Sequence, residues 1–132
     1  EDELFHHYKT VGEAISIPLL RGTARASTHP LVKLVMKRIV KDEAAHGRFG
    51  WLFLDWAGAL LSDEEHAFLG RVAADEVGKL ERMWGAIKPG NDVVEDVHAL
   101  GWMESQAYLD LARRTLVTDV IEPLAARGIH VR

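Results

Sequence analysis

The stretch "PLVKLVMKRIVKDEAAHGRFGWLFLDWA", residues 30 to 57, decides the fold class of this chain. Residues spaced three and four apart along it are apolar or small except at the centre, where Glu43 and His46 stand three residues apart. That spacing is typical of one face of an α-helix, and it places the carboxylate beside the imidazole. The face consists of Val32, Met36, Ile39, Glu43, His46, Gly50, Phe53 and Ala57.

The rest of the chain also has helical patterning, divided by glycine and proline, with no alternating pattern of convincing length that predicts a strand. Pro30 suits a first helical turn capped by Thr28 or His29. Ser62 and Glu65 match a capping box, which predicts the start of a third helix. The predicted helices span about 2–25, 30–61, 62–87 and 94–127, the last of them ended by Gly128 and bent or interrupted at Pro123.

We expect one all-α domain over residues 1–132, built from two helical hairpins. The first predicted helix is apolar on most sides, so we expect it to be buried between partners in a ligand-bearing hairpin, residues 1–61. The fourth has a single apolar seam with charged residues opposite, so residues 62–132 form a covering hairpin. The seam is Trp102, Leu109, Ala112, Leu116, Val120 and Leu124.

The composition excludes several classes of function. Sixteen Lys and Arg against 20 Asp and Glu give a net charge of -4 with no basic block, so nucleic acid is not an expected partner. No stretch is apolar enough to span a membrane, and we expect a cytoplasmic protein. The chain has no cysteine, which excludes thiolate zinc sites and iron–sulfur clusters. A transition metal would therefore be held by histidine and carboxylate, which suits iron, manganese or zinc.

Glu13, on the first predicted helix, is another carboxylate among mostly apolar neighbours. It lies 15 residues before Thr28 in the intervening turn, and Glu43 lies 15 residues after it. In an antiparallel hairpin both residues are about 22 Å from the turn, since each helical residue rises about 1.5 Å. One Glu from one helix and Glu-x-x-His from its neighbour is the recurring half-site of dimetal carboxylate bundles. The sequence therefore predicts that Glu13, Glu43 and His46 are metal ligands.

The segments "VGEAISIPLLRGTARASTHPLVKLVMKRIVKDEAAHGRFGWLFLDWA" (11–57) and "ALGWMESQAYLDLARRTLVTDVIEPLAARGI" (99–129) resemble the C-terminal half of uncharacterised bacterial ferritin-like domain proteins. The most specific part is "RIVKDEAAHGRFGW", residues 38–51. The resemblance implies a ferritin-like antiparallel helical bundle, half of a di-iron four-helix bundle plus two further helices. It also implies that this chain is the C-terminal part of a longer one.

The resemblance further implies that Asp42 hydrogen-bonds a ligating histidine and so orients it. Many motifs of this kind read Asp-Glu-x-Arg-His, whereas this chain has Ala45 at the Arg position. A redox-tuning role of that Arg is therefore not carried over.

A complete site needs a second Glu and a second Glu-x-x-His, and this chain supplies three ligands where six are wanted. Glu95 and His98 match the spacing but stand near a predicted helix start, and Glu76 is a further candidate ligand. The missing half would come from an upstream segment of a longer chain or from a second copy in a homodimer.

These features lead to a functional hypothesis and an alternative. The first is a non-haem di-iron oxidoreductase with two iron ions per complete site, which uses O2 or peroxide as a ferroxidase or as an oxidase or oxygenase of a small substrate. Glu13 would bridge or ligate terminally, Glu43 would bridge, and His46 would cap one metal. The alternative is a metal-free helical interaction module, in which the two-sided apolar first helix docks against a partner.

Overall fold

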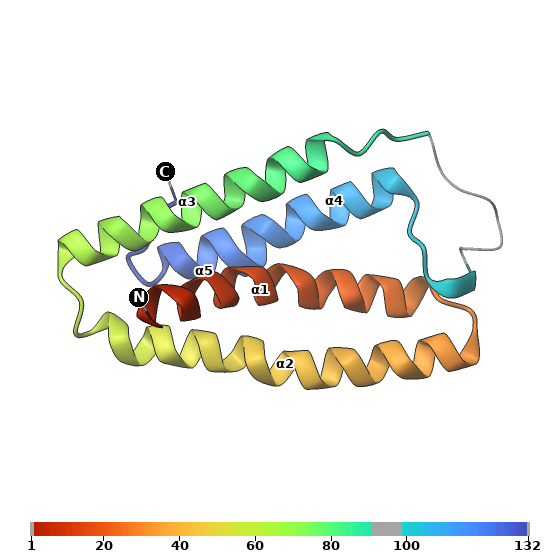
Figure 1. The fold of residues 1–132 in the computed structure, drawn as a ribbon, viewed down its shortest axis with the longest axis horizontal. Helices are drawn as coiled ribbons and strands as arrows, with labels where there is room; N and C mark the ends of the chain where they lie inside the picture. The colour runs from red at the N-terminus through yellow and green to blue at the C-terminus, as the bar shows by residue number, and fades with distance from the viewer. Residues whose placement is uncertain (1, 91–98, 132) are drawn as a thin grey trace.

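The computed structural model describes the backbone of residues 2–90 and 99–131, with side chains from residue 14 onward. In this part of the chain the structure is all-α and contains no strand, as predicted (Figure 1). The elements are α1 (Asp2–Ala26), α2 (Pro30–Gly58), α3 (Asp63–Gly85), α4 (Ser105–Leu116), the π-helical turn η2 (Val117–Ile121) and α5 (Glu122–Ala125).

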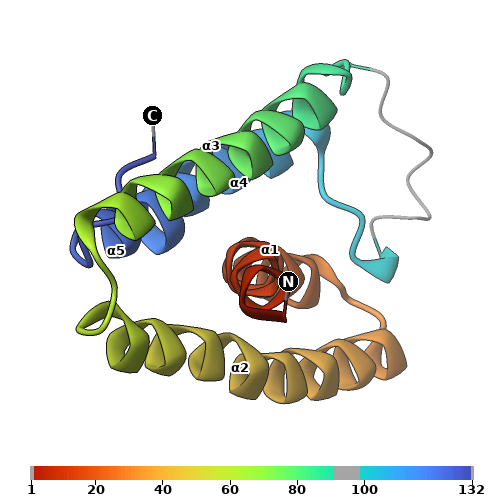
Figure 2. The ribbon, with the colours of Figure 1, turned by 60° about the vertical axis from the view of Figure 1, so that its left-hand side comes forward.

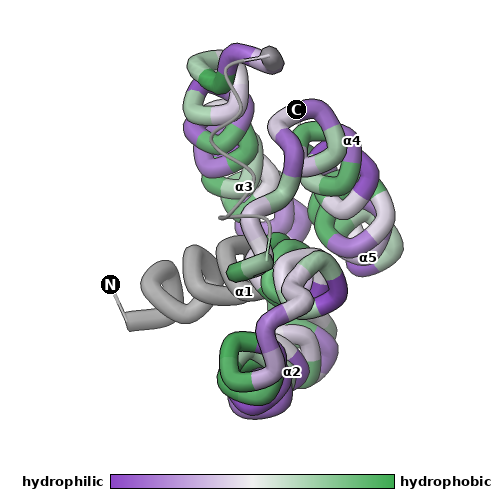
Figure 3. The backbone as a smooth tube through the Cα atoms, turned by 90° about the vertical axis from the view of Figure 1, so that its right-hand side faces the viewer, coloured by the Kyte–Doolittle hydropathy of each residue, from purple (hydrophilic) through white to green (hydrophobic). Residues whose placement is uncertain are grey.

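The helix α1 lies at the centre of the molecule. Figures 2 and 3 show it between α2 on one side and the pair α3 and α4 on the other. Its side chains Ile15 and Ala24 are buried, as an apolar helix with partners on two sides requires. The predicted position of the first helix between partners is confirmed, although Arg21 and Arg25 on the same helix are exposed. One consequence is that α2 packs mainly against α1 and keeps an open outer side.

The helix α2 begins as predicted and ends slightly earlier. Pro30 occupies the first turn, and His29 is the N-cap with extended backbone but without a side-chain capping bond. The helix ends at Gly58 rather than near Leu61, because the Leu60 and Leu61 amides turn back onto the carbonyl oxygens of Ala57 and Gly58.

The start of α3 confirms the predicted capping box. The Ser62 hydroxyl accepts from the Glu65 amide at 3.3 Å, and the Glu65 carboxylate accepts from the Ser62 amide at 2.7 Å. These bonds satisfy amide donors that have no partner inside the helix. They also hold the pKa of the Glu65 carboxyl below its usual value, mainly through the bond from the Ser62 backbone.

The fourth helix begins later than predicted. Residues 99 and 100 form a 3₁₀ turn, but residues 101–104 are not helical and α4 starts at Ser105, so the prediction of a continuous helix from about 94 is wrong at residues 101–104. The Glu104 side chain is the reason, because its carboxylate caps the helix by accepting from the amides of Gln106 and Ala107, each at 2.9 Å. Gly101 precedes this cap with a φ of 93°, which favours glycine.

The interruption expected at Pro123 takes the form of η2. A proline has no amide hydrogen to donate to the preceding turn, and the chain accommodates it by a wider turn in which the Glu122 amide donates to Val117. The predicted seam of this segment is confirmed except at Trp102, which is exposed. Its buried members are Leu109, Ala112, Leu116, Val120 and Leu124.

Candidate metal half-site on the α1–α2 hairpin

Glu43 and His46 are neighbours on α2, with 3.7 Å between Glu43 Oε2 and His46 Nδ1. The Glu43 side chain is 37% exposed and the His46 side chain 66% exposed. The mostly apolar face on which the sequence places both residues is therefore not buried around them in a single chain. The predicted pairing on one helix face is correct, but that face points beside α1 rather than into the core.

The physical reason for this rotation is Gly47. It is buried against α1, together with Gly50 and Leu54. A Cβ atom added at Gly47 would lie 2.8 Å from Ile17 Cδ1, so a larger residue here would require the tip of the Ile17 side chain to move. Because the packed face follows Gly47 rather than His46, the imidazole is turned toward the edge of the hairpin.

The Ile17–Gly47 contact also fixes which segments of the hairpin adjoin. Ile17 lies one helical turn after Glu13 on α1, and Gly47 directly follows His46 on α2. The backbone of Glu13 therefore belongs to the segment of α1 next to this contact. The Glu13 side chain lies outside the described residues, so its predicted ligation stays a prediction.

Asp42, the predicted orienting acid, accepts a hydrogen bond from Arg38 Nε at 2.9 Å. Both side chains are more than half exposed. In the described part of the chain the carboxylate thus serves an ion pair along the same helix.

The further candidate ligands are not brought to this pair. Glu76 lies on α3, across α1 from α2 (Figure 2), and forms an ion pair with Lys79 at 2.5 Å. Together with Asp75 it raises the pKa of the Lys79 ammonium, chiefly through its hydrogen bond. Glu95 and His98 lie outside the described residues. Among the residues whose side chains are described, no group of three or more His, Asp or Glu could hold a metal ion.

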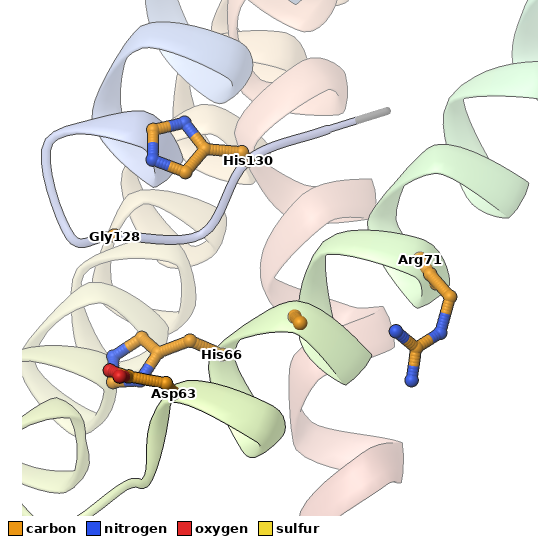
Figure 4. A pocket seen from close by; sticks show the side chains of 6 residues that line it. Asp63, His66, Arg71, Gly128 and His130 are labelled. Atoms are coloured by element: carbon orange, nitrogen blue, oxygen red, sulfur yellow. The ribbon is translucent and has the colours of Figure 1, made fainter.

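A second cluster of polar side chains lies where the C-terminal tail passes the start of α3. Asp63 and His66 lie close together there, His130 lies across the turn at Gly128, and Arg71 points away from them (Figure 4). His66 Nδ1 is 2.9 Å from the Ser62 carbonyl oxygen, a contact that fixes the ring against its own helix. The cluster therefore offers separate polar groups along a pocket rather than convergent ligands.

A feature of α2 that the sequence pattern did not predict is its exposed apolar outer side. Seven large apolar residues on this helix, together with Leu60 in the turn that follows it, are between 38% and 72% exposed. We call this set the outer face of α2. The sequence does contain a signal for it, because apolar residues occur on more sides of this helix than one neighbouring helix can bury. The outer face consists of Leu31, Leu34, Val35, Ile39, Phe49, Leu52, Trp56 and Leu60.

None of the helices, over the residues searched, is both long and apolar enough to cross a membrane. Comparison with known proteins gives no match to a protein-family model, to a curated protein or to a solved structure.

Proposed function

We propose that the α1–α2 hairpin supplies one half of a carboxylate-bridged dimetal site, with iron as the metal, in a protein that carries out oxidation linked to O2 or peroxide. The observation that carries the proposal is the Glu43–His46 pair, a carboxylate and an imidazole 3.7 Å apart on an accessible helix face. The fold is all-helical, and a ferritin-like bundle is the architecture that would use such a pair.

The donor geometry is compatible with one metal ion. Two ligands about 2.1 Å from a common metal, at tetrahedral or octahedral angles, are roughly 3.0 to 3.4 Å apart. The observed separation of 3.7 Å exceeds that range slightly. A small side-chain rotation in the partly exposed pair closes the difference, because neither group is held by packing on all sides.

Each residue has a defined part in this proposal. Glu43, next to α1, would bridge two metals, His46 would cap one of them, and Glu13 would ligate from α1. Asp42 would exchange its bond with Arg38 for one to a ligating imidazole, and so fix the ring. A bound iron pair would supply the redox chemistry, while the chain supplies ligand geometry and control of water access.

Three protein ligands leave two metals short of their full coordination, so the remaining donors must come from elsewhere. An upstream segment or a second copy of the chain would provide them. The exposure of His46 agrees with this need, because a site shared between segments must be open in the isolated hairpin.

The test is the metal content of the purified chain after anaerobic loading with Fe(II) and removal of excess metal. We expect at least one iron per chain and loss of most of it in Glu43→Ala and His46→Ala. His29→Ala is the matched control, since His29 is an exposed residue at the N-cap of the same helix and makes no side-chain capping bond. Iron near zero, or iron unchanged in the two ligand variants, would contradict the proposal.

A second candidate function is a metal-free helical interaction module. The outer face of α2 favours it, because large exposed apolar patches mark protein contact sites. Experiments can separate the two functions. An interaction module requires the outer face and still binds its partner in Glu43→Ala and His46→Ala.

A further inference from the structure

The outer face of α2 is larger than an isolated chain of this size ordinarily exposes. With roughly 200 Å² for a fully exposed large apolar residue, its eight members leave about 1,000 Å² open to solvent. The largest apolar patch of a typical monomer is about 300–600 Å². If two chains covered these faces mutually, the total would reach the roughly 1,200–2,000 Å² of a stable interface.

Six of the eight members of the outer face are placed symmetrically about one point on α2. Leu31, in the first turn of the helix, and Leu60, two residues past its end, are equally far in sequence from the point between Ala45 and His46. The same holds for Val35 with Trp56, and for Ile39 with Leu52. Each member of a pair is therefore an exposed apolar residue with an exposed apolar counterpart at the mirror position.

This symmetry is what a two-fold antiparallel helix pair requires. In an isologous contact, residue i of one chain meets residue j of the other, and j meets i. A helix that turns back against a copy of itself brings together positions equally far from the symmetry axis. A partner of unrelated sequence would place no such condition on the outer face.

We propose that two copies of this chain associate through the outer faces of α2, antiparallel, with the two-fold axis passing between Ala45 and His46. Leu31 then meets Leu60 of the partner subunit, and Val35 meets the partner's Trp56. The contact extends along the helix for about 43 Å, the length of 29 residues at about 1.5 Å each.

The polar centre of the face is compatible with burial in this arrangement. In the chain without metal, Arg38 and Asp42 are paired at 2.9 Å, so neither enters the interface as an isolated charge. Asp42 lies opposite the partner's Phe49, one helical turn from the partner's His46. A buried ion pair in this position adds little to the affinity between the two chains. Its role is to fix the register in which the two α2 helices pair.

The inference stands without the proposed metal site, since it uses only the apolar residues and their spacing. It also identifies a source for the missing ligands. The axis runs beside His46, so both Glu43–His46 pairs lie near it and close to one another. A second copy is then the partner that the half-site needs.

The absence of cysteine allows a direct test of register. Ala45 is exposed and lies next to the proposed axis. The Ala45→Cys variant, oxidised in the presence of a chelator, should therefore form a disulfide-linked dimer in high yield. Leu31→Cys alone should stay unlinked, and an equimolar mixture of Leu31→Cys with Leu60→Cys should link. Linking of Leu31→Cys to itself would indicate a parallel pair and overturn the proposal, as would failure of Ala45→Cys to link.

The mass of the unmodified chain in solution provides an independent measurement. Light scattering at micromolar concentration should give twice the chain mass of 14.7 kDa, and a monomer would overturn the proposal. Trp56→Glu should reduce the mass to that of one chain with unchanged helical circular dichroism. Phe68→Glu, an exposed aromatic on α3 outside the outer face, is the matched control and should remain dimeric.

Failure of this proposal and failure of the metal site are distinguishable. Iron bound by a monomeric chain would reject the dimer alone, whereas a chelator-resistant dimer without iron would reject the metal site alone.

Discussion

Arg127 and Asp55 form a two-pronged ion pair across 72 residues of sequence, with Arg127 Nε donating to Oδ1 at 2.6 Å and Nη2 donating to Oδ2 at 3.2 Å. The same guanidinium lies 4.8 Å from the centroid of the Trp51 ring. Other ion pairs of the described residues, such as Arg38–Asp42 and Lys79–Asp75, remain within one helix. The Arg127–Asp55 pair instead ties the end of the C-terminal helical segment to α2.

Asp55→Asn should make the free energy of unfolding less sensitive to a fall in pH. The hydrogen bond from Arg127 holds the pKa of Asp55 below its ordinary value of 3.8. A carboxyl with a lowered folded-state pKa stabilises the fold above the unfolded-state pKa, and this contribution is lost as pH falls through the folded-state pKa. The parent should therefore lose more stability than the variant when pH is lowered from neutral to below about 3, as measured by urea unfolding.

Asp75→Asn is the control for this prediction, because Asp75 pairs with the exposed Lys79 inside a single helix, where solvent screens such pairs and they contribute little. Equal acid sensitivity of the parent and Asp55→Asn would show that the long-range ion pair contributes nothing to folding.

Gly70→Ala should destabilise the protein by about 2–3 kcal/mol, despite the better helix propensity of alanine. A Cβ atom at Gly70 would overlap the His130 carbonyl oxygen, so the C-terminal tail would have to leave its place on α3. Thermal or urea unfolding measures the effect.

Gly78→Ala, on the same helix, should instead stabilise by about 0.5–1 kcal/mol. The nearest atom to its new Cβ is the tip of the flexible Arg82 side chain, at 3.3 Å. Similar effects of the two substitutions would mean that the tail does not pack on α3 as described.

Ser62→Ala should cost about 1 kcal/mol, because the first turn of α3 loses the hydroxyl that accepts from the Glu65 amide. Ser62→Gly should cost only a few tenths of that, since glycine leaves the end of the helix open to water. The free energies of unfolding of the two variants, compared with the parent, test whether the capping box sets the boundary between α2 and α3.

Local signals in the sequence predicted most of the helix boundaries, and their success has a physical basis. Pro30, the Ser62–Glu65 box and Gly128 act through bonds to near neighbours, which a short stretch of sequence fully contains. The start of α4 was missed because Glu104 caps it with a carboxylate, and a glutamate is far commoner inside helices than before them.

The orientation of α2 was less predictable than its existence. Apolar residues occur on nearly all its sides, so periodicity alone admits several packed faces. Gly47 determines which face of α2 packs on α1, because Ile17 approaches the helix where Gly47 has no side chain. This contact joins two helices, so the pattern of one helix does not reveal it. The Glu43–His46 pair was predicted as a neighbouring pair because that relation lies within one helix turn. Its exposure could not be predicted in the same way.

Metal binding should also appear as added stability, which provides a last test of the candidate site. A ligand that binds only the folded chain stabilises it by about 2.7 kcal/mol at a free concentration 100 times its Kd. For a domain of this size such a gain raises Tm by several degrees. Mn(II) is a suitable probe, since it favours carboxylate and imidazole ligands and permits a measurement without O2 chemistry. We expect Mn(II) to raise Tm in the parent and in His29→Ala, EDTA to reverse the rise, and the Glu43→Ala/His46→Ala double variant to show no change. A rise that persists in the double variant would assign the bound metal to other residues of the chain.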